Sequence, residues 1–187
     1  MSSKKTDQIV CSTDDVTIRE SDLRSLGARQ FLSDVIVSFA STELERSMPP
    51  AVRARVALLQ ATTAFLGAMM DVEPELVANL KLTDKELVAL PVNNNDDANV
   101  AFGGTHWSLL VYVRALDQFW YYDSMREYNL SAARVVARNF ARALGATKST
   151  TCKTTRLRAL AMILNKNFLV PYESCLQRNT TASKVIT

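Results

Sequence analysis

The chain has 187 residues, of which 48% are hydrophobic and 22% charged, and its formal net charge is +3. This length and composition are typical of one globular domain that buries roughly two thirds of its unfolded surface. No apolar run approaches the ~20 residues that span a bilayer, and residues 1–7 lack an apolar signal segment. We therefore expect no membrane partner and a cytoplasmic or nuclear location. Cys11, Cys152 and Cys175 have no paired spacing, which argues against a zinc site or a disulfide framework.

The basic charge is concentrated at one end of the chain. Residues 1–146 have 15 Lys and Arg against 18 Asp and Glu, whereas residues 147–187 have seven basic residues and one acid, Glu173. One interpretation is a basic arm that binds nucleic acid. The other is a solvated helix followed by a disordered end. We favour the second interpretation and do not expect nucleic acid as a partner.

Hydrophobic periodicity and breakers predict an α+β chain. In the first half of the chain we expect strands over 7–12 and 15–18, a turn-rich bridge over 20–26, a helix capped by Ser33 or Asp34 that ends near Met48, and a helix over 51–70. A short helix over 73–80, a strand over 86–92 with Pro91 at a sheet edge, and a polar loop over 93–97 follow. In the second half we expect strands over 107–113 and 119–122, a helix over 130–144 ended by Gly145, and a last helix over 155–169.

The strands over 107–113 and 119–122 are separated by five residues and fit a β-hairpin. His106, the only histidine, precedes the first strand, and Asp123 follows the second. An antiparallel hairpin therefore brings imidazole and carboxylate together, which is two thirds of a nucleophilic triad. A single histidine without an acidic cluster excludes a His-rich metal site, and no phosphate-binding glycine loop is present. Two roles of His106 remain as alternatives: general acid–base catalysis that activates a nucleophile, and a purely structural role.

The motif Gly103-Gly104-Thr105-His106-Trp107-Ser108, followed by an aromatic strand that ends Tyr122-Asp123-Ser124, resembles the His and Asp motifs of the Ulp/SENP cysteine proteases. The residues of these motifs resemble most those of the deneddylase branch of the family, which processes and removes the ubiquitin-like protein NEDD8. The resemblance covers residues 8–145, and residues 146–177 diverge. It implies a papain-like fold with a central mixed sheet flanked by helices, shortened after Gly145. It also implies one protease domain over 8–177 with a flexible tail over 178–187.

The resemblance assigns a role to each candidate site residue. His106 would be the general base that activates a cysteine, and Asp123 would orient its imidazole. Trp107 would be one wall of a narrow tunnel for a Gly-Gly tail. Phe31, which replaces the family's tryptophan, would be the other wall, and Asp34 would contact the partner. No cofactor or metal is implied, and the expected partner is NEDD8, or alternatively SUMO, with its conjugates.

The nucleophile departs from the family pattern, because the chain has no Asp-Cys-Gly motif. Cys152 lies near the expected position, but Lys153 stands where the family has glycine. Three explanations stay open: the sequence lacks a stretch after Gly145, Cys152 acts in an altered motif, or the chain is a pseudoenzyme. The functional alternatives are accordingly a deneddylase-like protease, a SUMO-specific protease and a catalytically inactive binding module. A nucleic-acid binder, supported only by the basic end, is a further alternative.

Overall fold

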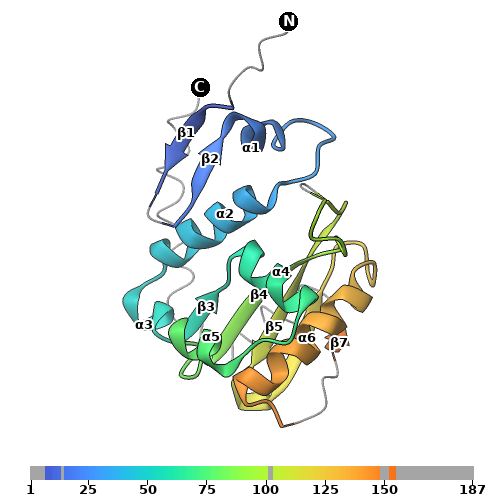
Figure 1. Cartoon of the computed structure of the whole chain (residues 1–187). Coiled ribbons are helices and arrows are strands. Elements are labelled where there is room, and N and C mark those ends of the chain that lie inside the picture. The colour runs from blue at the N-terminus through green and yellow to red at the C-terminus, as the bar shows by residue number, and fades with distance from the viewer. Residues whose placement is uncertain (1–6, 14, 101–102, 148–151, 155–187) are drawn as a thin grey trace, which may run out of the picture. The chain divides into compact units, whose positions relative to one another are not determined.

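The computed structural model describes residues 7–13, 15–100, 103–147 and 152–154 (Figure 1). All of them belong to one compact unit, Met1–Thr154. The expected helix over 155–169 and the expected tail over 178–187 lie outside the described residues. Among the helices that the structure describes, none combines the length and the apolar character needed to cross a bilayer.

The chain begins with a small antiparallel sheet of strands β1 (Ile9–Ser12) and β2 (Thr17–Arg19), which confirms the first two expected strands. The expected turn-rich bridge contains a short helix, α1 (Glu20–Arg24), which the sequence did not predict. Its start is fixed locally, because the backbone N–H of Arg19 donates to the Asp22 carboxylate at 2.9 Å. Asp22 is buried and also accepts a hydrogen bond from Ser33 Oγ at 3.2 Å. This bond ties α1 to the start of the next helix.

Helix α2 (Asp34–Ser47) agrees with the prediction. Ser33 is its N-cap, and the Ser33 hydroxyl accepts a hydrogen bond from the backbone N–H of Ile36. The helix ends at Ser47, and Met48 is its C-cap, immediately before the two prolines. In Figure 1, α2 lies between the small N-terminal sheet and the larger sheet. The Phe31–Asp34 segment is thereby held at the N-terminal end of α2.

The predicted helix over residues 51–70 is wrong. The structure has helix α3 (Pro50–Arg53), strand β3 (Val56–Leu58) and helix α4 (Ala61–Met69) in its place. The apolar spacing that suggested one long helix arises because β3 is buried in a sheet and α4 is buried on one side. Parallel pairing of β3 with Leu87–Ala89 supplies the backbone hydrogen bonds that a continuous helix would have supplied.

A five-stranded mixed sheet is the centre of the unit, in the order β3-β4-β5-β6-β7. Its other strands are β4 (Leu87–Asn93), β5 (Trp107–Val113), β6 (Gln118–Tyr122) and β7 (Cys152–Thr154), with a 3-10 turn, η1 (Arg114–Leu116), inside the hairpin. Strands β4, β5 and β6 are antiparallel neighbours, and the outer pairs are parallel. This confirms the α+β class with a mixed sheet and the hairpin itself.

Two details of the sheet differ from expectation. Strand β4 is an inner strand, but Pro91 lies beyond Ala89, the last β4 residue that pairs with β3. The missing N–H of Pro91 therefore removes no bond from the β3 side. The short strand β7, which the sequence analysis did not predict, follows Gly145 and pairs with β6 over three residues.

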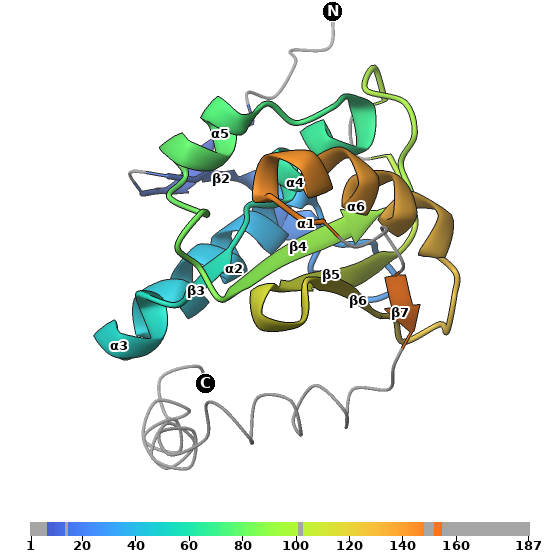
Figure 2. The same cartoon turned by 90° about the horizontal axis from the view of Figure 1, so that it is seen from below.

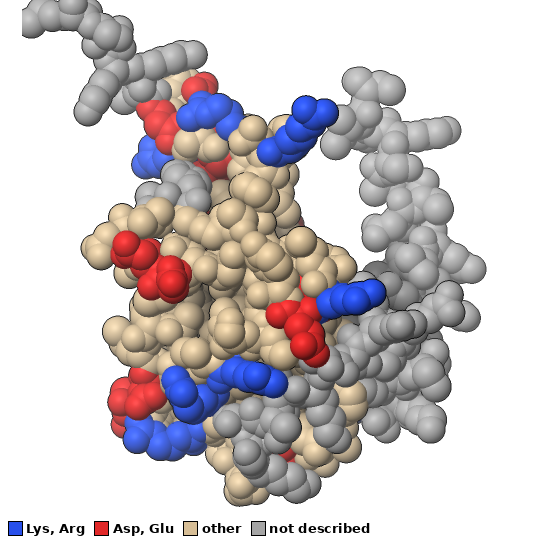
Figure 3. Space-filling model, turned by 90° about the vertical axis from the view of Figure 1, so that its right-hand side faces the viewer, with Lys and Arg blue, Asp and Glu red and all other residues tan. Residues whose placement is uncertain are grey.

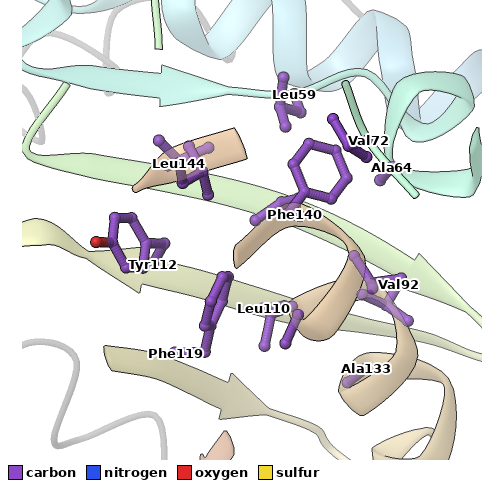
Figure 4. Close-up of a cluster of buried hydrophobic side chains, with 14 of the residues drawn as sticks. Leu59, Ala64, Val72, Val92, Leu110, Tyr112, Phe119, Ala133, Phe140 and Leu144 are labelled. Carbon is purple, nitrogen blue, oxygen red and sulfur yellow. The ribbon is translucent and has the colours of Figure 1, made fainter. Parts of the chain in front are cut away.

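Helices α4, α5 (Pro74–Asn79) and α6 (Leu130–Leu144) contribute to the core on one face of the sheet, and Figure 2 shows α4 and α6 above β4 and β5. The bounds of α5 and α6 agree with the prediction, and Gly145 ends α6 with a φ of 71°. Phe140 is fully buried near the centre of this core (Figure 4). It contacts Gly67 of α4, where a side chain would overlap its ring. This packing fixes α6, and therefore the turn that precedes α6, against the sheet.

Candidate active site

The hairpin places His106 and Asp123 side by side. Tyr122, the last residue of β6, pairs with Leu109 of β5, so the two site residues lie just outside the same end of the ladder. His106 Nε2 and Asp123 Oδ1 are 2.5 Å apart. The His106 side chain is 11% exposed, and that of Asp123 is fully buried. The pairing expected from the hairpin is thus confirmed, and water is largely excluded from it.

The Asp123 carboxylate is held by donors on both of its oxygens. Burial alone would raise its pKa, but hydrogen bonds from Tyr121 Oη, His106, and the backbone N–H groups of Met125 and Asn129 outweigh burial and lower the pKa below its ordinary value. The Met125 and Asn129 N–H groups lie 2.7 and 3.2 Å from the carboxylate. Asp123 is therefore kept ionised, and its orientation is fixed by four groups rather than one.

The contact with Asp123 selects one tautomer of the neutral imidazole. A carboxylate accepts hydrogen bonds, so His106 Nε2 carries the proton and Nδ1 is left with its lone pair. Nδ1 has no hydrogen-bond partner among the described residues, and the Tyr128 ring meets the imidazole edge-on at 5.5 Å between centroids. The arrangement can accept a proton at Nδ1 from a nucleophile, and Asp123 then stabilises the imidazolium that forms.

The backbone of His106 is fixed by the Asn-rich loop. Asn94 Oδ1 accepts hydrogen bonds from the N–H groups of Thr105 and His106, at 2.8 and 3.1 Å. Gly104 adopts a φ of 81°, and a Cβ there would overlap the Asn93 side chain. The sequence analysis identified this segment only as a polar loop. Its function in holding His106 was missed, and the Asn run facing a Gly-Gly pair was the available signal.

A cleft of about 380 Å³ is lined by residues on either side of His106 in the sequence, Gly103, Gly104 and Trp107. Both residues expected to be its walls line it, Trp107 from β5 and Phe31 from the segment before α2, and Asp34 lines it as well. Trp107 is anchored because its indole N–H donates to Leu32 O at 2.9 Å, and Phe31 is 61% exposed. The structure thus brings the three predicted partner-contacting residues together.

The surroundings of the cleft are mainly apolar. Helix α4 contributes Phe65 and Leu66, and the loop between β4 and β5 contributes Val100. The described part of this loop lies at the upper right of the larger sheet in Figure 1. Figure 3 views the molecule from that side, where most of the described surface carries no charged side chain. Exposed apolar clefts are common features of sites that bind other molecules.

Cys152 is not placed beside the pair. In the parallel register of β6 and β7, its backbone is level with Phe119, four residues before Asp123, or about 13 Å along the strands at ~3.3 Å per residue. Cys11 is exposed on β1, and Cys175 lies outside the described residues. Among the described residues, no group of three or more His, Cys, Asp or Glu is arranged to hold a metal ion.

Comparison with known proteins identifies the fold and then the family. The C-terminal Ulp1 protease domain, solved in complex with Smt3, the yeast ortholog of SUMO, superposes with a TM-score of 0.55 over 83% of this chain and 68% of that domain, at 13% identity. This likeness shows a Ulp-type protease fold. No family model matches the chain.

Curated relatives give the family. A Dictyostelium discoideum protein named "Probable sentrin-specific protease 8" is 34% identical over 141 residues, which is 72% of this chain and 58% of that protein. NEDD8-specific protease 1 of Arabidopsis thaliana is 34% identical over 137 residues, 72% of this chain and 59% of that protein. The chain belongs to the Ulp/SENP family of cysteine proteases. It spans about three fifths of the length of these relatives.

Proposed function

We propose that the protein is a cysteine protease specific for a ubiquitin-like protein, of the deneddylase type, and that it hydrolyses the bond that follows a C-terminal Gly-Gly. One observation carries the proposal: His106, which is paired with Asp123, immediately precedes Trp107, and Trp107 lines a cleft together with Phe31. The names of the relatives support NEDD8 as the partner, since both a sentrin-specific protease 8 and a NEDD8-specific protease match the chain.

The cleft suits a tail of glycines. Phe31 and Trp107 both line the cleft, and a segment without side chains can lie against such aromatic side chains with the least steric hindrance. Trp107 is held in place by its bond to Leu32 O, so its ring is preorganised for binding. Asp34 is the acidic residue at the cleft and would attract a basic residue of the same partner.

The pair supplies the chemistry that such a bond requires. His106 Nδ1 would remove the proton from a cysteine thiol, and the thiolate would attack the carbonyl carbon of the second glycine. The imidazolium, stabilised by Asp123, would then give this proton to the leaving amine. Water would hydrolyse the resulting thioester by the same proton transfers. The partner is thus released with a free carboxylate.

Cys152 is our candidate for the nucleophile, and it stays a prediction. The register of β7 leaves its backbone about four residues short of the level of Asp123, so reaction would require the chain around it to move. The same observation favours a second candidate function, in which the protein binds a ubiquitin-like partner at the cleft without cleaving it.

A cleavage assay distinguishes these functions. The full chain is incubated with C-terminally extended precursors of NEDD8 and of SUMO, and the masses of the products are measured by mass spectrometry. We expect shortening of the NEDD8 precursor after Gly-Gly, and no shortening by the His106→Ala variant. Binding of NEDD8 with no cleavage would support the binding module instead. Cleavage of the SUMO precursor in preference to that of NEDD8 would replace the deneddylase assignment with a SUMO-specific one.

A further inference from the structure

Asn129, the residue immediately before α6, is buried to 1% exposure beside the His106–Asp123 pair. The sequence analysis gave it no role. We infer that Asn129, together with Tyr121, is a positioning residue that holds the base and the acid of the site in their mutual geometry. This inference goes beyond the proposed function, because it concerns the pair itself and requires neither a nucleophile nor a particular partner.

One residue contacts both members of the pair. The side-chain amide of Asn129 donates to the backbone oxygen of His106 at 2.9 Å and to that of Val92 at 3.2 Å. Its backbone N–H lies 2.9 Å from Tyr121 Oη and 3.2 Å from Asp123 Oδ2. Asn129 thereby joins the end of β4, the start of β5 and the end of β6 at the point where the site is assembled.

The orientation of the amide is determined by its surroundings. Two carbonyl oxygens face the nitrogen, and a flipped amide would place its own oxygen against both of them. In the observed orientation Asn129 Oδ1 is buried without a hydrogen-bond partner among the described residues. A buried unpaired acceptor is unfavourable, so the two donated bonds are the reason for an asparagine at this position rather than an apolar side chain.

Tyr121 completes the support on the acid side. Its hydroxyl donates to Asp123 Oδ2, while His106 and the Met125 N–H use Oδ1. Burial first, and then the hydrogen bond to Asp123, raise the pKa of Tyr121 far above its ordinary value, so this donor keeps its proton. With donors on both oxygens, the carboxylate cannot rotate away from the imidazole without breaking several bonds.

The chain offers an unusually direct test, because His106 is the only histidine. The imidazole ¹⁵N–¹H spectrum of the labelled full chain therefore reports a single ring. The measured quantity is the exchange rate with water of the Nε2 proton that is bound to Asp123. The variants are Asn129→Ala, Asn129→Asp, which keeps the shape but not the donor, and Tyr121→Phe.

Two matched controls separate positioning from general loss of packing. Asn139 is a buried asparagine within α6 whose amide donates to Gly67 O at 2.9 Å, away from the site. Tyr112 is a buried tyrosine whose hydroxyl donates to Asp117 at 3.0 Å at the other end of the hairpin. The controls are Asn139→Ala and Tyr112→Phe, and thermal unfolding is recorded for every variant.

We expect the Nε2 proton to exchange at least about tenfold faster in Asn129→Ala and Asn129→Asp, and severalfold faster in Tyr121→Phe, with wild-type rates in both controls. Wild-type exchange in folded Asn129→Ala and Asn129→Asp would overturn the inference, as would equal acceleration in the controls. If the two Asn129 variants fail to fold, Tyr121→Phe, which removes one oxygen atom, decides the question. A failure of proteolysis leaves this measurement unaffected, so the two proposals are tested separately.

Discussion

Replacing Trp107 by alanine tests the cleft as the binding site of the ubiquitin-like tail. Trp107 forms one wall of the cleft, and its position is fixed by the bond from Nε1 to Leu32 O. Truncation of an anchored aromatic residue at an interface costs about 2 kcal/mol or more. We therefore expect the dissociation constant for NEDD8 to increase at least about thirtyfold, since each 1.4 kcal/mol corresponds to about a factor of ten.

Two further variants sharpen this prediction. Trp107→Phe keeps a flat ring but loses the hydrogen bond to Leu32 O, which is worth about 1 kcal/mol. Because this bond holds the ring in position, we expect the affinity for NEDD8 to fall roughly fivefold. Trp120, the other tryptophan, lies within β6 and does not line the cleft. Trp120→Phe is therefore the control and should bind as the wild type does. The assay is isothermal titration calorimetry of the full chain with NEDD8, with circular dichroism to verify folding. Wild-type affinity of folded Trp107→Ala would refute the assignment of the cleft.

The other predictions concern the fold around the site. Gly104→Ala should lower the free energy of unfolding by about 1–3 kcal/mol, because its φ is positive and the loop has no room for a Cβ. Gly145→Ala has open space around the new Cβ and should lower it by only about 1 kcal/mol. Equal melting temperatures of the two variants in thermal unfolding would contradict this prediction. Burial raises the pKa of Tyr112 and Tyr122 to about 12. Their contribution to the free energy of unfolding should therefore be fully present below pH 10 and decline as the pH rises toward 12. Phenolate absorbance and circular dichroism, recorded together, measure this decline. The pKa of Asp123 is lowered from 3.8, so its contribution should be present above pH 3.8 and be lost at lower pH, and Asp123→Asn should flatten that part of the acid unfolding curve.

The sequence contained enough local information to predict the acid–base pair. The apolar and β-branched run of β5, the aromatic run of β6 and the short loop between them predicted a hairpin, and its geometry alone brought His106 to Asp123. Caps gave the bounds of α2 and α6, since Ser33 begins one helix and Gly145 ends the other. These features depend on residues close together in the chain, which is why they could be identified without a structure.

The features that failed or were missed depend on tertiary contacts. Strand β3 was taken for part of a helix because its pairing with β4 is invisible in a spacing pattern. Asn94 was predicted only as part of a polar loop and Asn129 was given no role, whereas the Asn94 side chain accepts from the N–H of His106 and the Asn129 side chain donates to the C=O of His106. The placement of Cys152 beside Phe119 follows from a parallel pairing of β6 and β7 that no local pattern encodes.

Covalent capture tests the central claim most directly. The full chain is treated with NEDD8 that carries a C-terminal electrophile in place of the carboxylate, and the product is examined by intact and peptide mass spectrometry. If the chain is a protease, we expect a stable adduct on a cysteine, with Cys152 as our candidate. We also expect His106→Ala to abolish the adduct while NEDD8 binding is retained. Tight binding of this NEDD8 derivative with no adduct on any cysteine would contradict the claim that the chain is a protease.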